Sequence, residues 1–383
     1  MTVTAAQGFD AAGIAVGLKS SGNPDLALVV NRGPLQNASA VFTSNRAKAN
    51  PIIWSQQVIS DGRVSAIVLN SGGANCFTGS EGFQTTHLTA EAVAEAVDVS
   101  AGDVLVCSTG LIGVQLDREK LLPGIVEAAA ALSADGGLDA ANAIITTDTH
   151  AKISTHGADG WMIGGMAKGA GMLAPGLATM LVVLTTDAVL DSAELDRMLR
   201  VATRVSFDRL DSDGCMSTND QVTLMASGAS GIVPDLETFQ WALIDICTNL
   251  AVQLQTDAEG ASHDITIEVV NAVSEDDAVE VGRSVARNNL FKAAVFGNDP
   301  NWGRVLAAIG TTQAEFDPYQ VDVSMNGVRV CSSGGPDRPR EEVDLTPRSM
   351  SLVIDLKAGD ALATIYTNDL THDYVHENSA YSS

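Results

Sequence analysis

Thr179 follows a glycine-rich segment that differs in composition from the rest of the chain. Residues 160–178 read GWMIGGMAKGAGMLAPGLA, and the apolar run TMLVVLTT comes directly after them. Glycine lets a backbone take strained conformations and lets a side chain approach a carbonyl closely. In such a setting a threonine hydroxyl can attack the preceding carbonyl and form an ester, which water then hydrolyses. The bond between Ala178 and Thr179 is therefore the candidate for self-cleavage.

Cleavage would give Thr179 a nucleophile and a base in one residue. A free α-amine has a pKa of about 7.7 to 8.0, so it can accept the hydroxyl proton near neutral pH. This arrangement is a recognised route to covalent catalysis by a weakly acidic hydroxyl. From composition alone, however, a threonine that opens a strand is ordinarily structural. A phosphate-binding loop is the other interpretation of these glycines, but Lys168 precedes Gly169 and a strand follows, which is the wrong order.

Several further motifs carry a resemblance that decides between these interpretations. The run KGAGMLAPGLATM resembles the processing signature of the ArgJ family, the ornithine acetyltransferases or glutamate N-acetyltransferases. The similarity extends in the same order from near residue 1 to the last residue. Its motifs are NSGGAN (70–75), CSTGLIG (107–113), TTDT (146–149), FDRLDSDG (207–214), STND (217–220), DAEG (257–260), DPNWGR (299–304) and ENSAYSS (377–383).

The resemblance implies roles for the matched residues. Thr179 is expected to be the nucleophile, and Thr109 and Gly110 are expected to stabilise the oxyanion of a tetrahedral intermediate. Without the resemblance, STG would be an ordinary strand-to-helix turn and Glu259 a solvated carboxylate at a helix end. The residues expected to bind substrate are Thr146, Lys168, Thr179, Glu259, Asn378 and Ser383.

The implied reaction moves an acetyl group from N2-acetyl-L-ornithine to L-glutamate through an acetyl-Thr179 ester, in the acetyl cycle of arginine biosynthesis. No cofactor is expected, and acetyl-CoA would be a co-substrate only if the enzyme is bifunctional and also makes N-acetylglutamate from it. An amidase or aminopeptidase of the same fold would pass the acyl group to water. A non-catalytic amino-acid-binding protein would neither cleave itself nor become acetylated.

The chain departs from the family pattern beside two motifs. After DAEG the family usually continues with threonine and lysine, whereas this chain has Ala261, Ser262 and His263. The cation is lost there, and His263 could replace it only when protonated. After NSGGAN, Cys76 and Phe77 stand where small residues are common. The first departure puts substrate binding at its position in doubt, and the second could alter packing beside the site.

The elements that must position these residues alternate between strands and helices. Short apolar runs at 26–30, 39–43, 64–70 and 103–108 predict strands, and alanine-rich stretches between them predict helices. A long amphipathic helix is expected to begin at Asp235 and to end near Gly260. These patterns indicate an α/β or α+β class. The resemblance implies a layered α-β-β-α sandwich, shared with N-terminal-nucleophile aminopeptidases, and a smaller C-terminal part from about residue 265.

The resemblance also predicts how the chain is divided. Residues 1–178 would form an alpha chain and residues 179–383 a beta chain that begins with the nucleophile. The two products are expected to stay together and to associate further into a heterotetramer or a larger assembly.

Composition limits the classes of partner. The formal net charge of −25 disfavours nucleic acid and anionic lipid, because like charges repel. The chain has neither an apolar stretch of membrane-spanning length nor a basic start followed by an apolar segment, so a cytoplasmic location is expected. No histidine pair has metal-ligand spacing, so no metal is expected. The cysteines are odd in number and lack CxxC spacing, which favours a reducing compartment: Cys76, Cys107, Cys215, Cys247 and Cys331.

Overall fold

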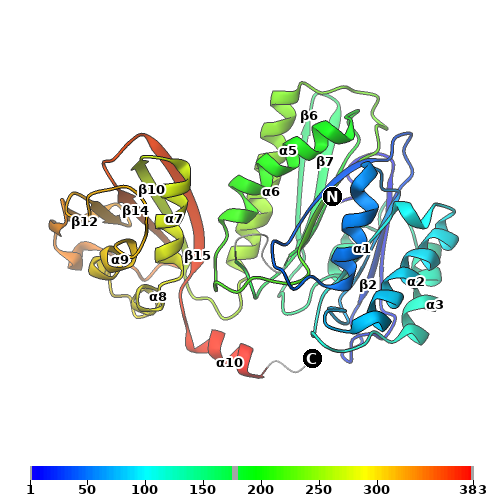
Figure 1. Ribbon diagram of the computed structural model, residues 1–383, viewed down its shortest axis with the longest axis horizontal. Helices are drawn as coiled ribbons and strands as arrows, with labels where there is room; N and C mark the ends of the chain where they lie inside the picture. Colours follow the sequence, from blue (N-terminus) through cyan, green and yellow to red (C-terminus); the bar gives the residue numbers. More distant parts are fainter. Residues whose placement is uncertain (1, 175–179, 381–383) are drawn as a thin grey trace.

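Two stacked β-sheets form the centre of the larger part of the molecule (Figure 1). The computed structural model describes residues 2–174 and 180–380 of the 383-residue chain. The first sheet has the order β1-β2-β4-β5. Its strands β2, β4 and β5 are buried along their whole length, as expected where a sheet is covered on both faces. They are β1 (Phe9–Ile14), β2 (Leu26–Asn31), β4 (Ala66–Asn70) and β5 (Val104–Ser108).

The second sheet has the order β3-β9-β8-β7-β6. Only the central pair β8–β9 is parallel, and the other neighbours are antiparallel. Its strands are β3 (Asn37–Phe42), β6 (Lys152–Ala158), β7 (Trp161–Lys168), β8 (Leu181–Thr186) and β9 (Gln221–Ala226). Strand β7 ends at Lys168 and β8 begins at Leu181, so the segment that carries the expected cleavage site connects two neighbouring antiparallel strands.

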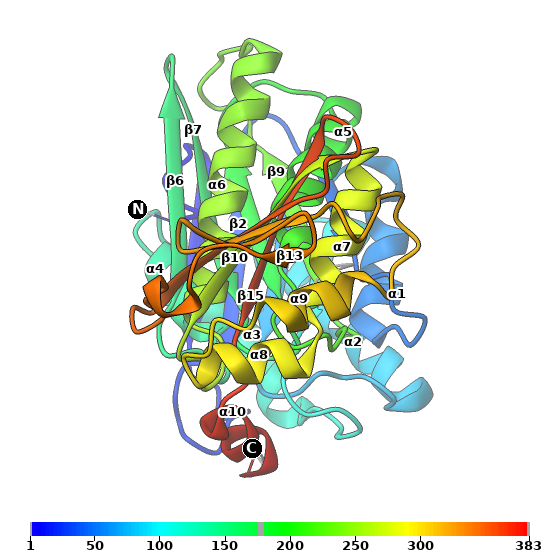
Figure 2. The ribbon, with the colours of Figure 1, turned by 90° about the vertical axis from the view of Figure 1, so that its left-hand side faces the viewer.

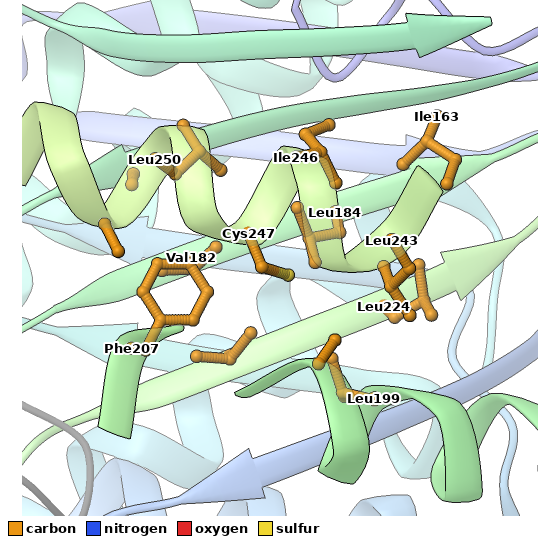
Figure 3. Close-up of a cluster of buried hydrophobic side chains, with 14 of the residues drawn as sticks. Ile163, Val182, Leu184, Leu199, Phe207, Leu224, Leu243, Ile246, Cys247 and Leu250 are labelled. Atoms are coloured by element: carbon orange, nitrogen blue, oxygen red, sulfur yellow. The ribbon is translucent and has the colours of Figure 1, made fainter. Parts of the chain in front are cut away.

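Three hydrophobic cores define the layers. Side chains of both sheets, such as Val29, Ile67 and Val183, share the core between the sheets. The outer face of the first sheet packs against α2 (Gly79–Val97) and α3 (Arg118–Ala130). The outer face of the second packs against α5 (Ser192–Val205) and α6 (Leu236–Thr256), as Figure 3 shows for Leu243, Ile246 and Leu250. Short helices α1 (Asn50–Val58) and α4 (Gly137–Ala143) complete this part. The predicted α-β-β-α sandwich is confirmed.

Helix α6 begins as predicted but ends one turn early. The Asp235 side chain accepts a hydrogen bond from the Thr238 N–H at 2.8 Å and caps the first turn. The last helical residue is Thr256, so the expected end near Gly260 is wrong. Residues 257–260 instead form a turn in which Gly260 has a φ of +61°. Glu259 therefore lies beyond the helix, and the expectation that it stands at the helix end is corrected.

Most of the remaining residues form a second, smaller unit beside the sandwich, in which helices pack on a single β-sheet (Figure 1). Its sheet has the order β13-β12-β11-β14-β10-β15, and one face is covered by helices α7 to α9. The strands are β10 (Asp264–Ala272), β11 (Asp322–Met325), β12 (Val328–Ser332), β13 (Gly335–Pro336), β14 (Ser349–Asp355) and β15 (Ala361–Asn368). The helices are α7 (Glu275–Ala286), α8 (Asn289–Phe296), α9 (Trp302–Ile309) and α10 (His372–Ala380).

Helix α10 follows β15 and runs back below the sandwich (Figures 1 and 2). The Thr371 hydroxyl donates to the Gly260 carbonyl at 2.6 Å, and the backbone of Tyr374 lies so close to Gly260 that no side chain would fit there. These contacts bring the C-terminal helix to the loop that follows α6. Among the helices of the described chain, none is both long and apolar enough to cross a membrane.

Candidate active site

A small cavity of about 130 Å³ collects most of the residues expected to act. They come from five separate segments: the end of β5, the loop after α4, the end of β7, the loop after α6, and α10. The expected residues that line the cavity are Thr109, Gly110, Thr146, Lys168, Glu259 and Asn378, joined by Thr147, Gly171 and Met172. Ala178, Thr179 and Ser383 lie outside the described residues.

Thr109 and Gly110 follow the last residue of β5. The Thr109 N–H donates to the Asn70 carbonyl at 3.0 Å, so its backbone donor is already used. Its hydroxyl accepts a hydrogen bond from Lys168 Nζ at 3.2 Å and keeps its own proton free to donate. Gly110 has a φ of +127°, and a Cβ there would lie 2.9 Å from Gly73 N. The pair can thus offer one side-chain hydroxyl and one glycine N–H to an oxyanion.

Lys168 is the last residue of β7, and its side chain is buried beside Thr109. It forms no ion pair with any carboxylate of the described residues, although Asp148, Asp220 and Glu259 are near enough to act on its charge. Burial lowers the pKa of Lys168 below its ordinary value against the opposing effect of Asp148. Within the described part of the chain, such a lysine is a cation without a carboxylate partner in direct contact, which suits the binding of an anion.

Glu259 and Asn378 meet across two segments far apart in the sequence. Asn378 Nδ2 donates to Glu259 Oε2 at 2.9 Å and to the Tyr374 carbonyl at 3.0 Å. The Glu259 N–H donates to the Ala170 carbonyl at 2.9 Å, which fixes the loop after α6 against the glycine-rich segment. Gly171 lies directly against the Glu259 carboxylate and leaves it room. The carboxylate therefore faces the cavity, and Asn378 is its amide partner among the residues that the structure describes.

Thr146 lies at the start of a loop organised by Asp148. The Asp148 carboxylate accepts hydrogen bonds from the Thr146 N–H at 3.0 Å and the Gly169 N–H at 2.6 Å. Burial opposes its charge, but Lys168 and Lys152 outweigh burial and lower the pKa of Asp148 to about 2. Asp148 is thus an anion that joins two pocket segments. Asp148 belongs to the TTDT motif, but no pattern in the sequence predicts its role, because the groups it joins are distant in the chain.

Two other motifs hold the backbone around the pocket and do not line it. Asn219 Nδ2 donates to the Ala74 carbonyl at 2.6 Å and to the Ser108 carbonyl at 2.8 Å, which joins STND to NSGGAN and to β5. Asp220 is fully buried and accepts the Met180 N–H at 3.2 Å, one residue after the expected nucleophile. Burial raises the pKa of Asp220 well above its ordinary value.

His263, where the chain departs from the family pattern, is a structural residue. Its ring is buried, with Nδ1 2.7 Å from Asp369 Oδ2 and Nε2 2.8 Å from the Leu345 carbonyl oxygen. Both ring nitrogens are thus occupied at the join between β10 and β15. The histidine does not line the cavity, so it does not replace the missing cation in the pocket.

The layered fold and the paired hydroxyl and glycine donors beside a buried lysine define the class: this is an acyltransferase on an α-β-β-α sandwich. The model of the ArgJ family matches residues 10–383. The arginine biosynthesis bifunctional proteins ArgJ of Streptomyces coelicolor and Thermobifida fusca are 63% and 58% identical to this chain, with 100% of both sequences covered in each comparison. The chain belongs to the ArgJ family and is an enzyme of arginine biosynthesis.

Solved structures of the family are also similar to the chain. The ornithine acetyltransferase of Mycobacterium tuberculosis, solved in complex with ornithine, is 50% identical over 47% of this chain and 96% of its own, with a TM-score of 0.45. The arginine biosynthesis bifunctional protein of Bacillus halodurans is 32% identical over 51% of this chain and 97% of its own, with a TM-score of 0.49.

Proposed function

We propose that this protein moves an acetyl group from N2-acetyl-L-ornithine to L-glutamate through an acetyl ester of Thr179, after cleaving itself between Ala178 and Thr179. The observation that supports this most strongly is the cavity itself. Residues from five segments that match one family's substrate-binding and oxyanion positions line a single small space. Residues 1–178 and 179–383 would remain one unit, which assembles into a heterotetramer or a larger complex in the cytoplasm.

The reaction divides into two half-reactions at one ester. The Thr179 hydroxyl adds to the acetyl carbonyl and passes its proton to its own α-amine, which gives a tetrahedral oxyanion. The Thr109 hydroxyl and the Gly110 N–H donate to that oxyanion. The C–N bond then breaks, ornithine leaves with the proton, and acetyl-Thr179 remains. The amine of glutamate attacks this ester, the C–O bond breaks, and Thr179 recovers its proton as N-acetylglutamate departs.

The charges around the cavity fit both substrates. The Lys168 ammonium would bind the α-carboxylate that acetylornithine and glutamate share, since it has no direct carboxylate partner among the described residues. Glu259, held by Asn378, would accept the side-chain ammonium of ornithine or orient the new amine of Thr179. Thr146 would add a polar contact. No cofactor enters either half-reaction.

The bifunctional alternative adds acetyl-CoA as a second acetyl donor to the same threonine. The ArgJ proteins of Streptomyces coelicolor and Streptomyces avermitilis are named bifunctional, which favours testing this donor alongside acetylornithine. In chemical terms the donor differs only in its leaving group, a thiol in place of an amine. An amidase of the same fold would lack a productive site for glutamate.

Intact mass spectrometry of the purified protein tests the proposal directly. We expect two fragments, of residues 1–178 and 179–383, and an acetyl adduct on the second fragment after incubation with acetylornithine. Thr179→Ala should remain one chain without an adduct, and Thr179→Ser is the conservative control. Cleavage of Thr179→Ala at the same bond, or ornithine release that glutamate does not accelerate, would contradict the proposal. Replacing acetylornithine by acetyl-CoA distinguishes the bifunctional enzyme.

A further inference from the structure

Lys152 lies behind the pocket at the centre of a buried ionic cluster. It is the first residue of β6, and its side chain has no solvent exposure. Nζ donates to Asp148 Oδ1 at 2.6 Å and also to Asp257 Oδ2. The two carboxylates are 0% and 5% exposed. Unpaired charges at such depth would be strongly unfavourable, so each member of the cluster depends on the others.

Each carboxylate of this cluster also holds a segment that carries a pocket residue. Asp148 accepts the Thr146 N–H and the Gly169 N–H, and Gly169 follows the pocket lysine directly. Asp257 accepts the Thr149 N–H at 3.0 Å together with the Thr149 hydroxyl, and it lies two residues before the pocket glutamate. The loop after α4, the end of β7 and the loop after α6 are therefore joined through one ammonium group.

The cluster also determines where the other buried cation points. Asp148 lies close enough to Lys168 to raise the lysine's pKa, yet Lys168 Nζ donates to Thr109. Asp148 is already paired with Lys152, so it does not draw the Lys168 ammonium away from Thr109. Were Lys152 uncharged, Asp148 would be a buried anion in need of a cation, and it already acts on the charge of Lys168.

We propose that Lys152 is a positioning residue for acetyl transfer: its ammonium neutralises Asp148 and Asp257, fixes the loops of Thr146 and Glu259, and leaves Lys168 directed at Thr109 and the substrate carboxylate. Lys152 itself does not touch substrate, since it does not line the cavity. The inference rests on the proposed function and adds a residue to it.

Removing the Lys152 charge should change the titration of Lys168 in a defined direction. The charged groups acting on Lys168 are Lys152 on β6, Asp148 on the loop after α4, Asp220 at the start of β9 and Glu259 after α6, while Lys19 interacts from the loop after β1. Burial and Lys152 lower the pKa of Lys168, and the three carboxylates raise it. Loss of Lys152 therefore raises this pKa and lets Lys168 turn toward Asp148.

The test compares Lys152→Met with Arg209→Met in the full, self-cleaved protein. Arg209 is a matched control because its side chain is also buried, 6% exposed, and is paired with Glu275 away from the cavity. For Lys152→Met we expect the KM for acetylornithine to rise at least tenfold. The alkaline limb of kcat/KM should move to higher pH. Hydrogen exchange should accelerate in peptides covering 145–150 and 168–172. Arg209→Met should lower the melting temperature and move none of these three readouts.

The outcomes separate the inference from the function on which it rests. A KM and an alkaline limb that change no more in Lys152→Met than in Arg209→Met would overturn the positioning role. If Lys152→Met does not fold, Asp257→Asn removes one carboxylate charge with almost no change in shape. A severalfold increase in KM and faster exchange of 145–150 would support the inference, and unchanged values would refute it. Wild-type protein without acetyl transfer would refute the function alone, while the exchange comparison would still test the cluster.

Discussion

Gly171→Ala should impair catalysis while leaving the fold nearly as stable as before. Gly171 does not have a positive φ, so alanine is compatible with its backbone. A Cβ at this position would lie 2.5 Å from Glu259 Cδ and 2.6 Å from Oε1. Ordinary van der Waals contact begins at 3.4 Å, so the carboxylate must move by about 1 Å. Because it is the end of a flexible side chain, it can move at little cost to the fold.

The displacement would weaken the hydrogen bond from Asn378 to Glu259 and shift the carboxylate away from the substrate ammonium. A misplacement of about 1 Å in a positioned group can reduce the rate by about 100-fold. We expect kcat/KM for acetylornithine to fall by about 10- to 100-fold, or about 1.4 to 2.8 kcal/mol of transition-state stabilisation. The free energy of unfolding should change by less than about 1 kcal/mol.

The assay measures ornithine release at varied acetylornithine and urea unfolding of the same preparations. Gly102→Ala is the matched control, because the nearest heavy atom to its Cβ would lie at 3.4 Å, in ordinary contact with Ser100. Unchanged kcat/KM in Gly171→Ala would mean that catalysis does not require the Glu259 carboxylate to lie where the structure places it. A loss of several kcal/mol in stability would mean that the carboxylate cannot move as reasoned.

Substitutions at three further positions test neighbouring contacts. Asn378→Ala removes the 2.9 Å hydrogen bond to Glu259, so the KM for acetylornithine should rise about 2- to 10-fold. Asn378 is exposed, so the free energy of unfolding in urea should stay unchanged, and a loss of stability would contradict a role in binding alone. Asp220→Ala leaves the buried Met180 N–H without its acceptor and should cost about 1 to 3 kcal/mol in the same assay. Asp220→Asn should cost less, because it keeps an acceptor oxygen and burial already favours a neutral group; equal losses would refute that reasoning. Asp148 has a folded pKa of about 2, below the unfolded value of about 3.9, so its contribution is present above pH 4 and is lost as pH falls toward 2. Asp148→Asn should therefore destabilise by roughly 2 kcal/mol more at pH 7 than at pH 2, and an equal loss at both would show that charge is not the cause.

Local patterns in the sequence were sufficient to predict several of the strands and the start of the longest helix. Apolar runs indicated the strands at 26–30 and 103–108, and Asp235 indicated the start of α6. Strand propensity and helix capping depend on neighbouring residues, so they can be read without the fold. The end of α6 could not be read in this way. Asp257 leaves the helix and binds Lys152, which is 105 residues away in the chain, so a distant charge shapes that turn.

The motifs likewise predicted which residues belong to the site, but only the tertiary structure shows that they line one cavity and which of their groups are free to bind. By itself the sequence determined which residue types were present at family positions: Thr109, Gly110, Lys168 and Glu259. It did not reveal that the Thr109 amide is already bonded and only its hydroxyl remains available. Nor did it indicate Lys152, which reads as an ordinary strand lysine. The burial of a charge, and the identity of its partner, depend on where distant segments are brought together, and short-range sequence patterns do not encode that arrangement.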